Sequence, residues 1–459
     1  MKGLLTKNKI DYVLFHLGRH CRISEEISNR FVFLPNLEEK IFNGKIIFPL
    51  SNSPLVIDEI ITKESIPVLF PLGNHATFYR IEKGNLIFHD DLLKSCFYLL
   101  SGYQELETKT LDRLNRFPFK ESLQHKLDFV EKPVVNYLFE IIIKGLEEFS
   151  GLHKLPFTRL SVFDRFCFFL SHDVDRLDTY TFYELGFRFK QAIGLSASET
   201  AWGRTIRTTF KYLLNYLFFF ARKNPQWDFP FHMGIEREYG INSSYYFLPQ
   251  GLLHQDAYYS FSEKRVLELV RKLADSGSEI GLHGSVRTYN SETYLQQDYK
   301  HFTSHFSSNP QGIRQHRLLF DNSVTPRIQN NMGLKYDASL GFAESEGFRN
   351  SYCFPFKLFN HENDAMLDIW EIPLLVMDAT LYHYKRYSAA EAEQAVQGLI
   401  HEVEKFGGIF SLLWHNGYFN EELYPGIREM YINTIKAISE MKSESLTGKA
   451  IIERMEKGN

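Results

Sequence analysis

Two aspartates at the end of an aromatic run are the residues best suited to chemistry in this chain. Residues 168–175 (FFLSHDVD) have the pattern of a buried strand, so Asp173 and Asp175 share one face of it. Two close carboxylates do not both ionise freely unless a cation lies between them or one carries a proton. Solvated aspartates in a turn are the simpler interpretation of Asp-x-Asp alone. The polar residues at the ends of later strands favour a metal site with an adjacent general base.

Further short apolar runs end on a polar residue downstream. They are residues 279–285 (EIGLHGS), 312–316 (GIRQH), 370–374 (WEIPL) and 409–416 (IFSLLWHN). A helical pattern over 262–276, closed by Gly277, precedes the first of them. Strands that alternate with helices and end on polar side chains are typical of α/β sheets and barrels, which build their sites at the C-terminal edge of the strands.

At these residues the chain resembles the polysaccharide deacetylases, the NodB-homology group or carbohydrate esterase family 4, as a divergent branch. The resemblance covers about residues 165–450 and rests on all the motifs in order. It implies a distorted (β/α) barrel. It also implies that Asp173 is the catalytic base, that Asp175 and His283 bind a divalent metal such as zinc, that Arg314 holds the base, and that His415 is the general acid.

The sequence does not decide which residue corresponds to one further acidic residue of the family. The family has an acidic residue that orients the acid, and both Glu371 and Asp378 are candidates in residues 371–378 (EIPLLVMD). In this reading Arg314 keeps Asp173 ionised, and His415 protonates the leaving amine.

The main departure from the family concerns the metal. Its second histidine is expected four residues after His283, where this chain has Arg287. Catalytic zinc usually takes three protein ligands, so a third comes from elsewhere, or the metal is weakly held, or catalysis is lost. His301 and His305 have chelating spacing, but the apolar stripe of their helix places them on its flank. His316 is interpreted as structural, because a lone histidine beside an apolar strand usually packs.

Composition limits the remaining possibilities. The 459 residues are 44% hydrophobic, which predicts two domains: residues 1–155, a small α/β domain of unknown role, and residues 156–459, the deacetylase-like barrel. A net charge of −4 offers no basic field for nucleic acid. Four scattered cysteines and a charged N-terminus without a secretory apolar core predict a cytoplasmic protein.

An unusually long insertion, about residues 187–230, interrupts the expected barrel. Its aromatic run 212–220 is too short to span a bilayer. Basic residues flank it, which allows an interfacial helix, but a helix packed over the barrel is the expected arrangement.

The expected function is therefore a metal-dependent hydrolase that removes an acyl group from an N-acetylated sugar, a carbon–nitrogen bond other than a peptide bond. An allantoinase-like amidohydrolase is a variant within that class. The alternative is a non-catalytic carbohydrate-binding pseudoenzyme that has lost the metal, which Arg287 favours. The persistence of Asp173, Asp175, Arg314 and His415 favours the enzyme.

Overall fold

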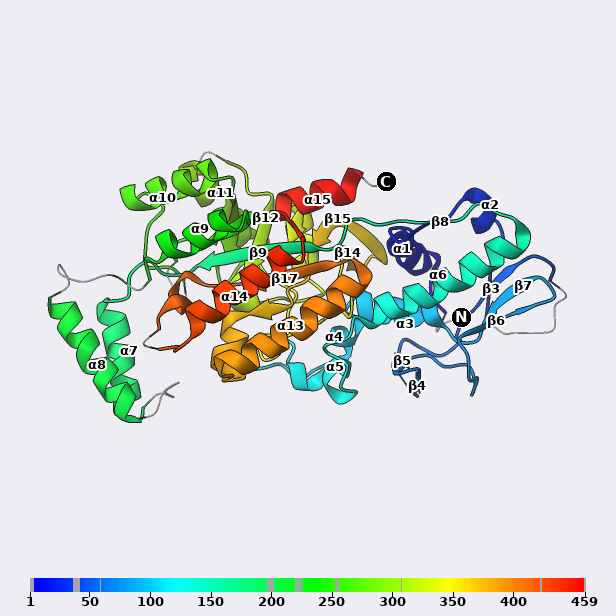
Figure 1. The fold of residues 1–459 in the computed structure, drawn as a ribbon, viewed down its shortest axis with the longest axis horizontal. Helices are drawn as coiled ribbons and strands as arrows, with labels where there is room; N and C mark the ends of the chain where they lie inside the picture. Colours follow the sequence, from blue (N-terminus) through cyan, green and yellow to red (C-terminus); the bar gives the residue numbers. More distant parts are fainter. Residues whose placement is uncertain are drawn as a thin grey trace.

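The computed structural model describes residues 4–35, 42–57, 59–195, 202–218, 224, 226–251, 256–306, 308–421 and 423–457. Its C-terminal part is built around one curled sheet of mostly parallel strands (Figure 1). The strand order is β14 (Phe356–Asn360), β15 (Ala365–Glu371), β13 (Tyr336–Asp337), β12 (Gly312–Gln315), β11 (Glu279–Gly284), β10 (Ser243–Phe247), β9 (Cys167–Val174), β17 (Ile409–Leu413) and β16 (Val376–Met377). The short β18 (Glu444–Ser445) also pairs with β9.

The sheet has the character of an incomplete (β/α) barrel, as the sequence predicts. All its ladders are parallel except that of β14, and the edge strands β14 and β16 are not paired with each other in the described part of the chain. Helices α9 (Phe229–Glu238), α10 (Lys264–Asp275), α11 (Glu292–Phe306), α12 (Thr325–Asn331), α13 (Ala389–Phe406), α14 (Ile427–Glu440) and α15 (Gly448–Lys457) connect or follow the strands. Every residue of β9 is buried, as expected for a central parallel strand covered on both faces.

The N-terminal part is a small α/β unit. Its four-stranded sheet has the order β2 (Phe31–Leu34), β3 (Ile46–Pro49), β7 (Asn85–Phe88) and β6 (Tyr79–Glu82), and β4 (Ile61–Lys63) pairs with β5 (Ile66–Val68). Its main helices are α1 (Lys7–Leu17), α3 (Leu92–Leu100), α4 (Tyr103–Glu107) and α6 (Val134–His153).

The helical segment that follows β7 is broken into α3 and α4. Gly102 has φ 66° and separates α3 from α4, and a Cβ there would lie 2.8 Å from Nδ2 of Asn322. The chain turns here because only glycine combines this backbone conformation with such a close approach.

The two parts are packed tightly against each other. A buried ion pair joins Arg349 to Glu105 at 2.9 Å, and the Tyr12 hydroxyl donates to the carbonyl of Lys357 at 2.8 Å. One continuous apolar core contains residues from both parts. The domain boundary near residue 155 therefore stays a prediction.

The insertion forms a helical hairpin, α7 (Phe182–Ala192) and α8 (Trp202–Leu217). Figure 1 shows the two helices side by side, apart from the body of the barrel, near the end to which β9 points. The expectation of a helix packed over the barrel is therefore wrong: α8 packs on α7 instead. Residues 219–220, the end of the aromatic run, lie outside the described part. No described helix is long and apolar enough to cross a membrane.

Candidate active site

The C-terminal edge of the sheet brings the predicted metal ligands together. Asp175 follows β9, and His283 lies near the end of β11, two strands away. Nε2 of His283 is 3.2 Å from Oδ1 of Asp175 and 3.6 Å from Oδ2 of Asp173. Parallel strands end at a common edge, which is why residues more than 100 positions apart meet here.

His316 lies at the same place, contrary to the expectation that it is structural. It follows β12, and its Nε2 is 3.7 Å from Oδ2 of Asp175. Ligand atoms of Asp175, His283 and His316 all lie within 4.8 Å of one another. A signal was present in the sequence, because His316 is two residues after Arg314 and the period of two that pairs Asp173 with Asp175 applies here too.

These three side chains fit a divalent metal. Nδ1 of His283 is hydrogen-bonded to the carbonyl of Arg314 at 2.9 Å, which leaves Nε2 to carry a lone pair toward the site. Nε2 of His283 and Oδ1 of Asp175 are buried without a hydrogen-bond partner among the described residues. Burying such polar atoms costs free energy unless a bound ligand, such as a metal ion, interacts with them.

The charges of the site favour metal binding as well. Burial lowers the pKa of His316 to about 3, with His283 and Arg317 adding to this effect and Asp175 opposing it. Burial would raise the pKa of Asp175, but His316, His283 and His415 hold it well below the usual value. Asp173 and Asp175 overcome the effect of burial and raise the pKa of His283, so a metal would displace a proton there.

Arg314 lies beside the predicted base. Its Nε is 3.4 Å from Oδ1 of Asp173, and its Nη2 donates to the Ser171 hydroxyl at 2.8 Å. The guanidinium is fully buried and lies over the ring of Tyr246, 5.1 Å from the centroid. A rigid, planar cation in this position holds the neighbouring carboxylate in place.

Asp378, and not Glu371, contacts His415. Oδ1 of Asp378 is 2.8 Å from Nδ1 of His415, and Oδ2 accepts the backbone N–H of the same residue. Burial would lower the pKa of His415, but Asp378, helped by Asp175 and Asp173, raises it to about 10. Nε2 of His415 lies 4.0 Å from Oδ2 of Asp173, so a protonated imidazolium faces the predicted base.

Glu371 is committed elsewhere. It ends β15 opposite Asp337 of β13, and its Oε1 accepts the backbone N–H of Leu340 at 2.8 Å. Burial and the neighbouring Asp337 raise its pKa well above the usual value.

His301, His305 and Arg287 do not belong to the group of candidate metal ligands. His301 and His305 stack on each other on α11, 4.7 Å apart, next to Phe261. The guanidinium of Arg287 lies over the ring of Tyr294, 4.3 Å from its centroid. The position of the missing family histidine is therefore used for packing.

A cleft of about 430 Å³ opens above these groups, and the N-terminal part of the chain forms one of its walls. Arg116 lines it, pairs with Asp112 at 2.8 Å, and donates to the carbonyl of Arg317 at 3.0 Å and to the Tyr384 hydroxyl at 3.2 Å. Arg317 and the next residue have φ of 62° and 55°, so this bond holds a strained turn directly after His316. The sequence alone indicated no functional residue in the N-terminal part, to which Arg116 belongs.

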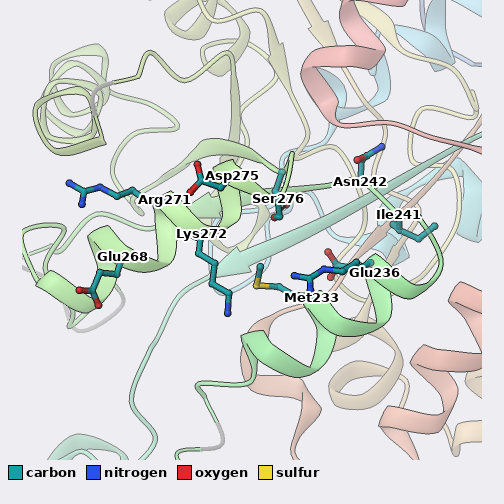
Figure 2. A pocket seen from close by; sticks show the side chains of 12 residues that line it. Met233, Glu236, Ile241, Asn242, Glu268, Arg271, Lys272, Asp275 and Ser276 are labelled. Atoms are coloured by element: carbon teal, nitrogen blue, oxygen red, sulfur yellow. Dashed lines mark hydrogen bonds between the residues drawn. The ribbon is translucent and has the colours of Figure 1, made fainter.

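Two other features are less suited to this chemistry. A pocket of about 730 Å³ lies between α9 and α10, at the N-terminal ends of β10 and β11 and thus at the opposite edge of the sheet (Figure 2). His172, His232 and Glu236 also have metal-ligand spacing, but they are buried, and His172 already bonds the carbonyl of Trp414 at 2.7 Å and Glu236 at 3.0 Å.

Comparison with known proteins gives matches to both parts of the chain. A family model described as "Family of unknown function (DUF7033)" matches residues 6–150. No curated protein has a significant match. Similar solved structures include a protein named as a polysaccharide deacetylase from Mycobacterium smegmatis, with 17% identity, a TM-score of 0.42, and coverage of 64% of this chain and 91% of that one. Another is PuuE allantoinase, with 12% identity, a TM-score of 0.44 and the same coverages.

A third similar structure is a carbohydrate esterase family 4 pseudoenzyme from Bacillus anthracis, with 10% identity, a TM-score of 0.32, and coverage of 63% of this chain and 66% of that one. The matches to deacetylases cover the C-terminal part of the chain. The fold of this part, taken from its own strands, is mixed α/β with one curled, mostly parallel sheet.

Proposed function

We propose that this protein is a metal-dependent hydrolase that removes an acyl group from the nitrogen of an N-acylated sugar. The supporting observation is the meeting of three functional sets in one cleft: Asp175, His283 and His316 as ligands, Asp173 beside Arg314, and His415 on Asp378. A pure binding module has little use for a base and an acid beside a ligand set.

Each residue has one task in the proposed reaction. The metal, when bound to Asp175, His283 and His316, would supply Lewis-acid activation of water and of the amide carbonyl. Asp173 takes the proton of the attacking water, and Arg314 holds that carboxylate in position. His415 gives its Nε2 proton to the departing nitrogen, and Asp378 holds the ring for this transfer. The products are a carboxylic acid and a free amine.

The carbohydrate substrate is supported by aromatic side chains in the cleft. Tyr418 and Tyr424 line it with rings stacked 4.8 Å apart and 14° from parallel, and such faces suit sugar rings. Zinc is the proposed metal because two histidines and a carboxylate are a common catalytic zinc set. Four buried, unbridged cysteines agree with a reducing compartment such as the cytoplasm.

The test is acetate release by the purified, zinc-loaded chain from N-acetylglucosamine oligomers and from nucleotide-linked N-acetylglucosamine. Asp173→Asn removes the base with little change of volume and should lower kcat by about 10²-fold or more, with zinc still bound. Equal rates for the two proteins would exclude the base role. Stoichiometric zinc without hydrolysis of any N-acyl sugar would favour a binding protein instead.

A further inference from the structure

The hairpin of α7 and α8 carries its apolar side chains on the outside. On α8 they form one stripe at helical spacing, and their exposed fractions are large: Trp202 71%, Ile206 41%, Phe210 60%, Leu213 38% and Leu217 61%. On α7, Phe182 is 77% and Phe189 59% exposed. Large apolar side chains this exposed are concentrated on the hairpin, whereas isolated ones occur elsewhere on the molecule.

Polar side chains fill the inside of the same hairpin. Thr205, Thr208, Thr209 and Asn215 of α8 are buried. The Thr209 hydroxyl contacts the carbonyls of Thr205 at 2.8 Å and of Arg188 at 3.1 Å, and Arg188 of α7 lies over the ring of Tyr212, 5.1 Å from its centroid. The amphipathic pattern is thus inverted relative to that of a helix packed on a protein core. No described part of the chain covers this outer face, and an exposed apolar face of this size is typical of an interaction surface.

The charges identify the kind of surface that would cover it. Helix α8 has three basic residues, Arg204, Arg207 and Lys211, and no acidic one, and on α7 the exposed Lys190 directly follows the exposed Phe189. Tryptophan, phenylalanine and leucine alternating with lysine and arginine are typical of helices that lie in the interface of an anionic bilayer. At 16 residues, α8 suits lying on a membrane and not crossing it.

We propose that the α7–α8 hairpin docks this protein on an anionic lipid surface with its apolar stripe in the membrane interface. Phe187 and Arg188 of α7 line the active-site cleft, so docking brings the mouth of that cleft to the bilayer. The proposal goes beyond the hydrolase function and does not depend on it, because it concerns a surface that the reaction does not use.

The experiment is co-sedimentation of the full chain with vesicles of phosphatidylglycerol and phosphatidylcholine, compared with vesicles of phosphatidylcholine alone. The chain should bind the anionic vesicles, and less so as salt is raised. Phe210→Ser with Leu217→Ser should lower the partition coefficient at least about tenfold. Leu152→Ser is the matched control, because Leu152 is 56% exposed but lies on α6. Trp202 emission should shift to shorter wavelength on binding.

Several outcomes would overturn the proposal. They are no binding to either vesicle, equal binding to both, or equal loss in the Leu152→Ser control. Self-association that is abolished by the hairpin substitutions, without vesicle binding, would show that a protein surface covers this face. Hydrolysis of a soluble substrate should be unchanged in the hairpin variants, so failure of docking and failure of the hydrolase function are read separately.

Discussion

Nδ1 of His415 lies 2.8 Å from a carboxylate oxygen of Asp378, and the other oxygen of that carboxylate accepts the backbone N–H of His415. The two contacts fix the direction in which Nε2 points and favour the charged ring. The candidate acid is therefore both oriented and protonated before a substrate arrives.

Substitution of Asp378 tests this pair. Asp378→Asn should lower kcat by about 10²-fold. It should also lower the pKa of His415 from about 10 toward its usual 6.5, because the stabilising negative charge is lost. Since the acid must be protonated, the alkaline limb of the pH–rate profile moves to lower pH. Glu371→Gln is the control, and a larger effect there than in Asp378→Asn would reverse the assignment.

His316 is expected to be the third metal ligand. His316→Ala should weaken zinc binding by more than about 100-fold, because a three-ligand site loses one of its ligands. His305→Ala should leave the affinity unchanged, since His305 stacks on His301 on α11. Competition with a zinc chelator, followed by metal analysis, measures both. Unchanged affinity in His316→Ala would mean that the third ligand lies elsewhere.

Restoring the family histidine should not help. Arg287→His replaces a guanidinium that lies over Tyr294 and does not point into the ligand set. With His316 in the coordination sphere, the same chelator titration should show no tightening of zinc. A clear gain in affinity would show that the metal lacks a ligand in the natural chain.

The N-terminal part is expected to affect the metal through Arg116. Arg116→Met removes the hydrogen bonds to the Arg317 carbonyl and the Tyr384 hydroxyl, so the strained turn after His316 can relax. Zinc affinity should fall several-fold, about 3- to 10-fold for one or two lost hydrogen bonds. Arg113→Met is the control, because Arg113 lines the same cleft but, among the described residues, makes no hydrogen bond to this turn. Equal zinc affinities of the Arg116→Met and Arg113→Met variants would mean that Arg116 lines the cleft without affecting the metal site.

Acid should destabilise the packing between the two parts of the chain. Burial lowers the pKa of His20 to about 4 and that of His16 well below its usual value. Both rings are therefore neutral in the folded protein but titrate near 6.5 when unfolded. Their stabilising effect is complete above pH 6.5 and is lost as the pH falls toward 4, by up to about 3 kcal/mol for His20.

Urea unfolding at pH 7 and pH 5 measures this effect. The free energy of unfolding should drop between pH 7 and pH 5. His16→Leu should reduce the drop, because a leucine has no charge to acquire beside Tyr352 of the C-terminal part. The exposed His401→Gln should leave the drop as it was. A pH dependence that is the same in all three proteins would exclude the buried histidines as its cause.

The sequence by itself determined the strands of the site and the polar residues at their ends. Asp173 and Asp175 could be paired because a period of two places alternate residues on one face. The resemblance to the polysaccharide deacetylases implied His283, Arg314 and His415, which also end short apolar runs. These rules are local and need no knowledge of packing. The same sequence rule applied to His316, but its place against Asp175 depends on a turn with two left-handed residues, which sequence patterns do not reveal.

Only the tertiary structure decided the rest. The sequence left both Asp378 and Glu371 as candidates for the carboxylate beside His415. The strand pairing favours Asp378, because β16 pairs with β17, which leads to His415, whereas β15 lies beside β13 and Asp337. Arg116 reaches the cleft by a contact across about 200 residues, and no local pattern encodes such a contact. The insertion was misjudged for a related reason: an apolar stripe shows that a helix has an apolar face, but not what covers it.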